Sequence, residues 1–133
     1  MKADPRRTVS LFQIFTATGL LLYWIGFFVF NLVPENPPPC YFSFEGAFPF
    51  PDAVLAVFLL IAGILGLKGV RVGRTLSLAS AGALVFLGLL DTSFNLQNGV
   101  YSSSLFDLVL NGLINVWAVG FGGFTIIAHN RFS

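Results

Sequence analysis

The sequence predicts an all-α integral membrane protein, a bundle of four transmembrane helices with both termini in the cytoplasm. The first observation is composition: of 133 residues, 56% are hydrophobic and only 10% are charged. Soluble domains average about 25% charged residues, and a chain so poor in charge would expose large apolar patches in water. We therefore expect a lipid bilayer around it. The lengths of the apolar runs and the placement of the charges point the same way.

Four apolar runs are each long enough to cross a hydrocarbon core about 30 Å thick as a helix. None shows the period-two alternation of a barrel strand. The first run follows basic residues, but it is too long for a signal peptide and no cleavage site follows it, so we interpret it as a helix. The whole chain, 1–133, is treated as one domain. The predicted spans cover about 9–33, 52–68, 74–92 and 104–128, with a Pro- and Phe-rich outer loop at 34–51.

The orientation follows from the cations, because Lys and Arg concentrate in the cytoplasmic loops of membrane proteins. All seven precede the first span, lie between the second and third, or follow the fourth: Lys2, Arg6, Arg7, Lys68, Arg71, Arg74 and Arg131. The acids fall at the opposite side, Asp4 excepted: Glu35, Glu45, Asp52, Asp91 and Asp107. This asymmetry predicts a multi-pass protein of the cell (plasma) membrane, with both termini inside.

The outer loop contains three consecutive prolines, Pro37, Pro38 and Pro39, which favour an extended segment. Its aromatic residues suit the outer membrane interface, where such rings are enriched. An alternative is that the loop forms a lid over something beneath it. Glu35 and Glu45 are interpreted as loop acids in water.

Polar and small residues recur at helical spacing along each span, which predicts stripes that face the bundle interior. On the fourth span the stripe includes Asp107, Asn111 and Asn115, and the opposite face, with Trp117, suits lipid. Each stripe has its polar group near the outer end. We therefore predict an outward-opening polar site. Its walls and mouth would be Asp91, Asp107, Asn111 and Asn115, with Asp52, Asn31 and Asn95.

Helix capping explains two of the acids of this site but not the third. Asp52 follows Pro51 and suits a helix N-terminus, where an acid caps free N–H groups. Asp107 completes a capping box with Ser104. Asp91 ends the third span, where the helix dipole disfavours an anion. Either that helix ends early and Asp91 is in water, or Asp91 faces the bundle as a functional candidate.

Several classes of chemistry are excluded by residue counts. One Cys and one His leave no intramolecular disulfide, CxxC pair or multi-histidine metal site in a single chain. There is no phosphate-cradling Gly loop and no basic patch for nucleic acid, and no cofactor is indicated. His129 is interpreted as a residue of the cytoplasmic interface.

The leading hypothesis is a site for a cation or a small polar, cationic ligand, used for transport or sensing. A second is a membrane enzyme doing acid–base chemistry on a lipid-soluble substrate, which requires an apolar pocket opening sideways between spans. A third is an accessory subunit, which requires polar stripes satisfied among themselves. Glycine-lined faces also suit a homo-oligomer or a membrane complex. The residues leave open whether the protein is an enzyme.

Overall fold

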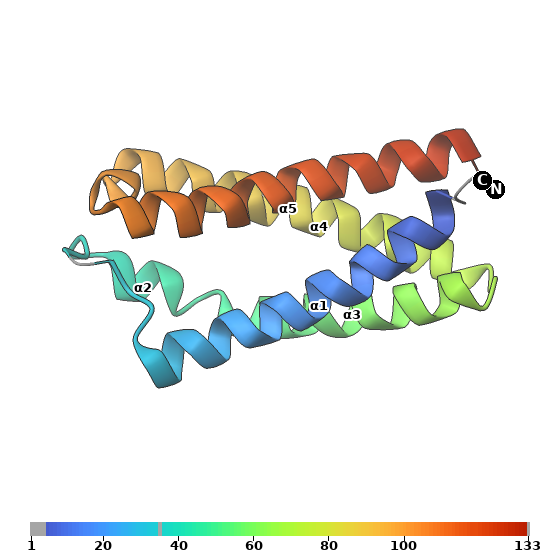
Figure 1. The fold of residues 1–133 in the computed structure, drawn as a ribbon, viewed down its shortest axis with the longest axis horizontal. Coiled ribbons are helices and arrows are strands. Elements are labelled where there is room, and N and C mark those ends of the chain that lie inside the picture. The colour runs from blue at the N-terminus through green and yellow to red at the C-terminus, as the bar shows by residue number, and fades with distance from the viewer. Residues whose placement is uncertain (1–4, 35, 133) are drawn as a thin grey trace.

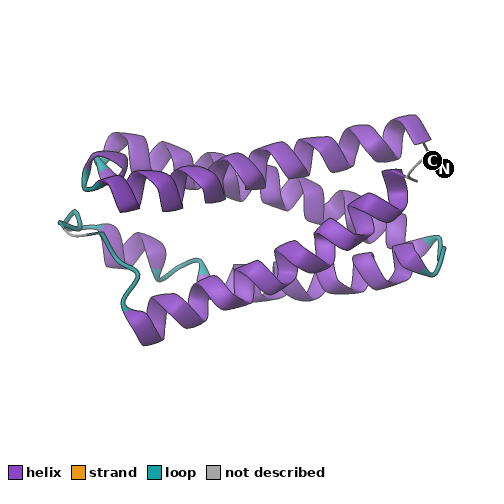
Figure 2. Cartoon of the chain, viewed as in Figure 1, coloured by secondary structure: helices purple, strands orange, loops and turns teal. Residues whose placement is uncertain are grey.

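The computed structural model describes residues 5–34 and 36–132. Lys2, Asp4 and Glu35, which entered the predictions above, lie outside these ranges. Within them, all regular structure is helical (Figure 2). The elements are α1 (Pro5–Phe30), α2 (Tyr41–Glu45), α3 (Pro49–Leu67), α4 (Val72–Gln97), the short 3-10 helix η1 (Val100–Ser102) and α5 (Leu105–Phe132).

The four predicted spans correspond to α1, α3, α4 and α5, each long and apolar enough to cross a membrane. The all-helical prediction is thus confirmed, but the helices are longer than expected. α3 begins at Pro49 because proline is tolerated in the first turn, where its missing N–H would have no helical partner. α4 continues to Gln97, so it does not end at Asp91.

The long helices run alternately up and down as two pairs, α1 with α3 and α4 with α5 (Figure 1). α3 also packs on α4, whereas α1 and α5 touch over a shorter stretch. One end of the bundle holds the start of α1, the end of α5 and the turn between α3 and α4. We call it the basic end. The opposite end, with α2 and η1, is called the acidic end.

Small residues let the paired helices approach closely. A Cβ added at Gly63 of α3 would lie 2.8 Å from the carbonyl oxygen of Ser10 in α1. In the other pair, a Cβ at Gly122 of α5 would lie 2.8 Å from the carbonyl oxygen of Ala81 in α4. Gly63 and Gly122 therefore face a neighbouring helix, as the small-residue stripes of the spans predict.

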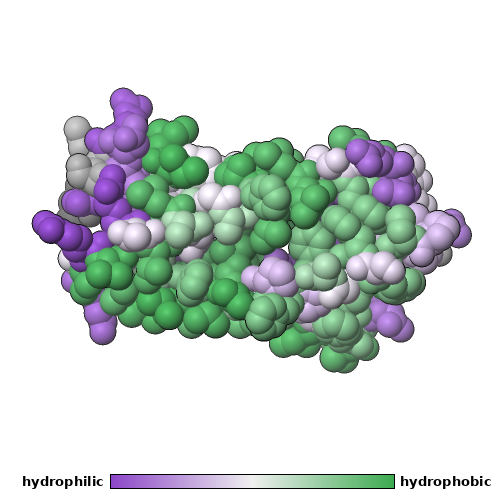
Figure 3. Space-filling model, turned by 180° about the vertical axis from the view of Figure 1, so that it is seen from behind, coloured by the Kyte–Doolittle hydropathy of each residue, from purple (hydrophilic) through white to green (hydrophobic). Residues whose placement is uncertain are grey.

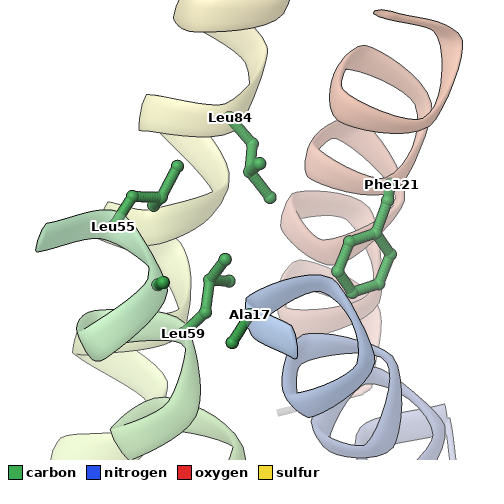
Figure 4. Close-up of a cluster of buried hydrophobic side chains, with 6 residues drawn as sticks. Ala17, Leu55, Leu59, Leu84 and Phe121 are labelled. Carbon is green, nitrogen blue, oxygen red and sulfur yellow. The ribbon is translucent and has the colours of Figure 1, made fainter. Parts of the chain in front are cut away.

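An apolar cluster joins all four long helices near the middle of the bundle (Figure 4). Its buried members are Ala17, Leu55, Ala56, Leu59, Leu84 and Phe121. Other large apolar side chains point outward, and they form a broad hydrophobic surface between two more hydrophilic ends (Figure 3). A hydrophobic surface between two hydrophilic ends is typical of a protein that lies in a bilayer.

Residues 36–51 lie at the acidic end, and they are not wholly at the surface. Tyr41 and Phe48 are buried, and Phe44 stacks on Phe94 of α4 with ring centroids 3.9 Å apart. Phe42 and Phe50 are exposed, as expected of interfacial rings. The aromatic rings of this segment are therefore divided between the bundle interior and the exposed surface.

Candidate functional site

A cavity of about 450 Å³ lies among α1, α3, α4 and α5, beneath α2, in the half of the bundle toward the acidic end. Most of its walls are apolar, with Leu20 and Leu87 among them. Three carboxyl side chains also line it, those of Glu45, Asp52 and Asp91. No Lys, Arg or His is among its described lining residues, so no protein cation offsets these acids there.

Asp91 faces the bundle, which decides between the two alternatives left open for it. Its Oδ2 atom accepts hydrogen bonds from Nδ2 of Asn115 at 2.7 Å and Nδ2 of Asn95 at 3.3 Å. Oδ1 of Asn115 accepts in turn from the Tyr101 hydroxyl and from Asn95. The amides of two helices therefore fix the carboxyl group of Asp91 at the cavity wall.

Glu45 is the acid whose role the sequence interpretation missed. It was expected in water, but it is only 5% exposed and lines the same cavity as Asp91. The correction comes from α2, which buries Glu45 together with Tyr41. Their spacing of four residues is typical of one helical face, and it was a signal available in the sequence.

Asp52 lies in the first turn of α3, as expected, where an acid complements the helix dipole. The N-cap position is Phe48, so Asp52 is not the N-cap residue. Its Oδ2 atom accepts a hydrogen bond from Nε1 of Trp24 in α1 at 2.8 Å. Trp24 and Asp52 both line the cavity, so this hydrogen bond lies at the cavity wall.

Asp107 does form the predicted cap: its backbone N–H donates to Ser104 Oγ at 3.0 Å, and that hydroxyl donates to Asp107 Oδ2 at 2.9 Å. Although buried, Asp107 does not line the cavity. Asn111 does line it, with its Nδ2 bound to the Asp107 carbonyl oxygen at 3.0 Å.

The two remaining predicted residues, Asn95 and Asn31, are not at the cavity mouth. Asn95 is 1% exposed and lies behind Asp91 as a support. Asn31 is exposed just after α1, with φ of 55°, a left-handed conformation that Asn tolerates at a helix end. The structure thus brings together Asp52, Asp91, Asn111 and Asn115 around the cavity and adds Glu45.

The cavity meets the outer surface of the bundle between α1 and α5. Phe15 and Gly19 of α1 and Leu113 of α5 line it, and all three are exposed. Trp117 was expected to face lipid, but its Nε1 donates to Thr16 Oγ1 at 2.9 Å and its ring stacks on Phe121. That contact draws α1 and α5 together below the opening.

At the basic end, His129 is also placed differently from its interpretation. It is buried, and its Nε2 lies 2.7 Å from Ser77 Oγ. Nε2 of Gln13 donates to the same hydroxyl at 2.5 Å. The bundle therefore has a second polar group, separated from the cavity by the central apolar cluster.

Comparison with protein-family models, with curated proteins and with solved structures finds no match to this chain. The carboxyl groups of Glu45 and Asp91 line the same cavity. If both were ionised they would repel each other, unless a cation lay beside them. The arrangement can therefore bind a cationic group or exchange a proton with a bound molecule.

Proposed function

We propose that this protein binds a lipid-soluble molecule with a cationic head, for example a lipophilic amine. The head would lie beside Glu45, Asp52 and Asp91, and the body would fill the apolar part of the cavity. We further propose that the chain spans the cell membrane with both termini in the cytoplasm, which places the cavity in the outer half of the bilayer.

The charge of the site is the observation that carries this proposal. Three carboxyl groups share an apolar cavity that has no Lys, Arg or His among its described lining residues. Buried acids without a cation are costly, and a bound ammonium group would relieve that cost. Asn111 and Asn115 add amide groups that can orient a hydrogen-bonding head.

The shape of the cavity favours an amphipathic ligand over a bare metal ion. Ligand cavities for small molecules hold roughly 300–1,000 Å³ and are mostly apolar, with few polar groups, and a volume of about 450 Å³ fits this class. A bare ion would need several oxygen ligands close together and would leave the apolar walls uncovered. In the described residues, no group of three His, Cys, Asp or Glu could hold a metal ion.

The exposed lining residues between α1 and α5 support entry from the surrounding lipid. Gly19 has no side chain there, and a Cβ added to it would meet nothing within 4 Å. Below the cavity, Leu55, Leu59 and Leu84 close the bundle interior. The cavity would therefore bind the ligand from the lipid and retain it, as a sensor requires. Transport would require the two helix pairs to separate.

The test is thermal unfolding of the protein purified in a neutral maltoside detergent, with alkyl amines of increasing length and the alcohols of the same length. A ligand that binds only the folded state stabilises it by about 2.7 kcal/mol at roughly a hundred times its Kd. We expect amines, but not alcohols, to raise the melting temperature. In Asp91→Asn the affinity should fall by about tenfold or more, since a hydrogen bond to a charged group is lost.

Two further variants separate binding from folding. Asp107→Asn removes a buried acid of the same end that does not line the cavity, and it should bind amines like the wild type. Gly19→Leu fills the opening without changing any charge, and it should weaken amine binding while the protein still folds. Equal amine affinity in wild type, Asp91→Asn and Gly19→Leu would contradict the proposal.

A further inference from the structure

A second cavity, of about 680 Å³, lies at the basic end of the bundle. Five of the seven Lys and Arg residues of the chain line it, and no acid is among its described lining residues. These five are Arg6, Arg7, Lys68, Arg71 and Arg74. They come from the first turn of α1, the α3–α4 turn and the start of α4, so distant parts of the sequence contribute to one recess.

The floor of this cavity is polar and ordered. Gln13 is 1% exposed and Ser77 is 2% exposed, and both line the cavity together with His129. The hydrogen bonds through Ser77 Oγ hold these three side chains in fixed positions. Hydroxyl and amide groups at the base of a cationic recess can donate hydrogen bonds to an anion as well as accept them.

Two helix N-termini add to the positive potential of this cavity. Arg6 and Arg7 belong to the first turn of α1, and Arg71 and Gly73 flank the first residue of α4. Helix N-termini carry partial positive charge and free N–H groups, which favour phosphate and similar anions. The helix termini and the five side-chain cations therefore both favour the binding of an anion.

Membrane topology explains part of this pattern but not all of it. The positive-inside preference accounts for cations at one end of the bundle. It does not require them to line one recess over a buried polar floor. Arg131 shows the difference, because it belongs to the same end and yet does not line the cavity.

We propose that this cavity binds a phosphate-bearing anion. The phosphate could belong to the headgroup of an anionic lipid or to a soluble phosphorylated molecule, and the same side chains would recognise both. Arg71, at the N-cap of α4, and Arg74 in its first turn would bind the phosphate together with Arg6 and Arg7 of α1. Guanidinium groups suit this role because they donate two parallel hydrogen bonds to phosphate.

The experiment has two arms, each comparing wild type, Arg71→Gln/Arg74→Gln and Arg131→Gln. In the first, inorganic pyrophosphate is titrated into detergent-solubilised protein by calorimetry, at constant ionic strength. In the second, native mass spectrometry counts lipids retained from nanodiscs of phosphatidylcholine with or without phosphatidic acid. Binding only in the first arm identifies a soluble phosphate ligand, and retention of phosphatidic acid identifies a lipid headgroup.

In either arm we expect the double variant to bind about tenfold more weakly or worse, because hydrogen bonds to charged groups are lost. Arg131→Gln should bind like the wild type, although it also loses a positive charge from this end. Unchanged melting temperatures without ligand show that the variants fold. The proposal is overturned if neither probe binds the wild type, or if Arg131→Gln loses as much affinity as Arg71→Gln/Arg74→Gln.

Discussion

Ser77 shows how single polar residues stabilise this apolar protein. It lies in the interior of α4, 2% exposed, and its hydroxyl bonds both Gln13 of α1 and His129 of α5. A buried polar group without a partner costs more free energy than a satisfied hydrogen bond contributes. Removing the shared hydroxyl therefore affects three helices at once.

We expect Ser77→Ala to lower the free energy of unfolding by about 1–3 kcal/mol, because it leaves buried groups of Gln13 and His129 without this partner. Thermal or denaturant unfolding in detergent measures the change. Ser93→Ala is the control, since Ser93 of the same helix is exposed and its hydroxyl accepts a hydrogen bond from Gln97. It should change stability by less than about 0.5 kcal/mol. Equal stability of the two variants would show that the Ser77 hydrogen bonds contribute little.

At the acidic end, Asp91 and Glu45 are polar residues that line a cavity, as Ser77 does at the basic end. The amides of Asn95 and Asn115 hold the Asp91 carboxyl group, while α2 brings Glu45 against it. The position of Asp91 could be proposed from its sequence, since it had no structural role there. Glu45 was instead interpreted as a loop acid in water, although its four-residue spacing from Tyr41 was a signal for one buried helical face.

At the scale of elements, glycine determines how closely the helices of each pair can pack. Gly122 lies against the backbone of α4, with only 2.8 Å from an added Cβ to the Ala81 carbonyl oxygen. The next residue, Gly123, has nothing within 4 Å of an added Cβ. Neighbouring glycines of one helix therefore have different roles, and only one is a packing residue.

Gly122→Ala should destabilise the protein by about 1–3 kcal/mol, because the added methyl group forces α5 away from α4. Gly123→Ala should leave stability unchanged or raise it by up to about 1 kcal/mol, since alanine is the better helix former. Unfolding midpoints of the two variants in the same detergent measure this contrast. Equal destabilisation by both variants would be inconsistent with the α4–α5 contact described here.

At the scale of the whole molecule, charge separates along the bundle axis. The described acids Glu45, Asp52, Asp91 and Asp107 lie toward the acidic end, and the described Lys and Arg residues lie at the basic end. An apolar cluster lies between the two cavities. The two proposed ligands follow this separation: a cationic ligand is proposed for the acidic end and an anionic ligand for the basic end.

The proposed orientation can be read from Cys40, the only cysteine of the chain, which is exposed near α2. A membrane-impermeant maleimide should label it in intact cells that express the protein, and Cys40→Ser should abolish the signal. In Cys40→Ser/Lys68→Cys, labelling should appear only after permeabilisation, because Lys68 lies at the basic end. The reverse pattern would place the termini outside.

The number of long helices, their approximate bounds and the charge asymmetry followed from the sequence alone. These properties are local: a run of about 20 apolar residues specifies a span, and the positions of Lys and Arg relative to the runs specify which ends share a charge. Asn111 and Asn115 were also placed toward the interior by their spacing on one helix. The cap at Asp107 was recognised because its partner is three residues away.

Only the tertiary structure decided which of these residues meet. Glu45 beside Asp91, Trp24 on Asp52 and His129 on Ser77 are pairs that come from different helices, so no sequence period encodes them. They depend on which helices pack together and how far each is rotated, and those choices are made by contacts such as Gly63 on Ser10 and Gly122 on Ala81. The sequence by itself determined four apolar helices with opposite charges at their ends, whereas side-chain packing between helices determined the two cavities.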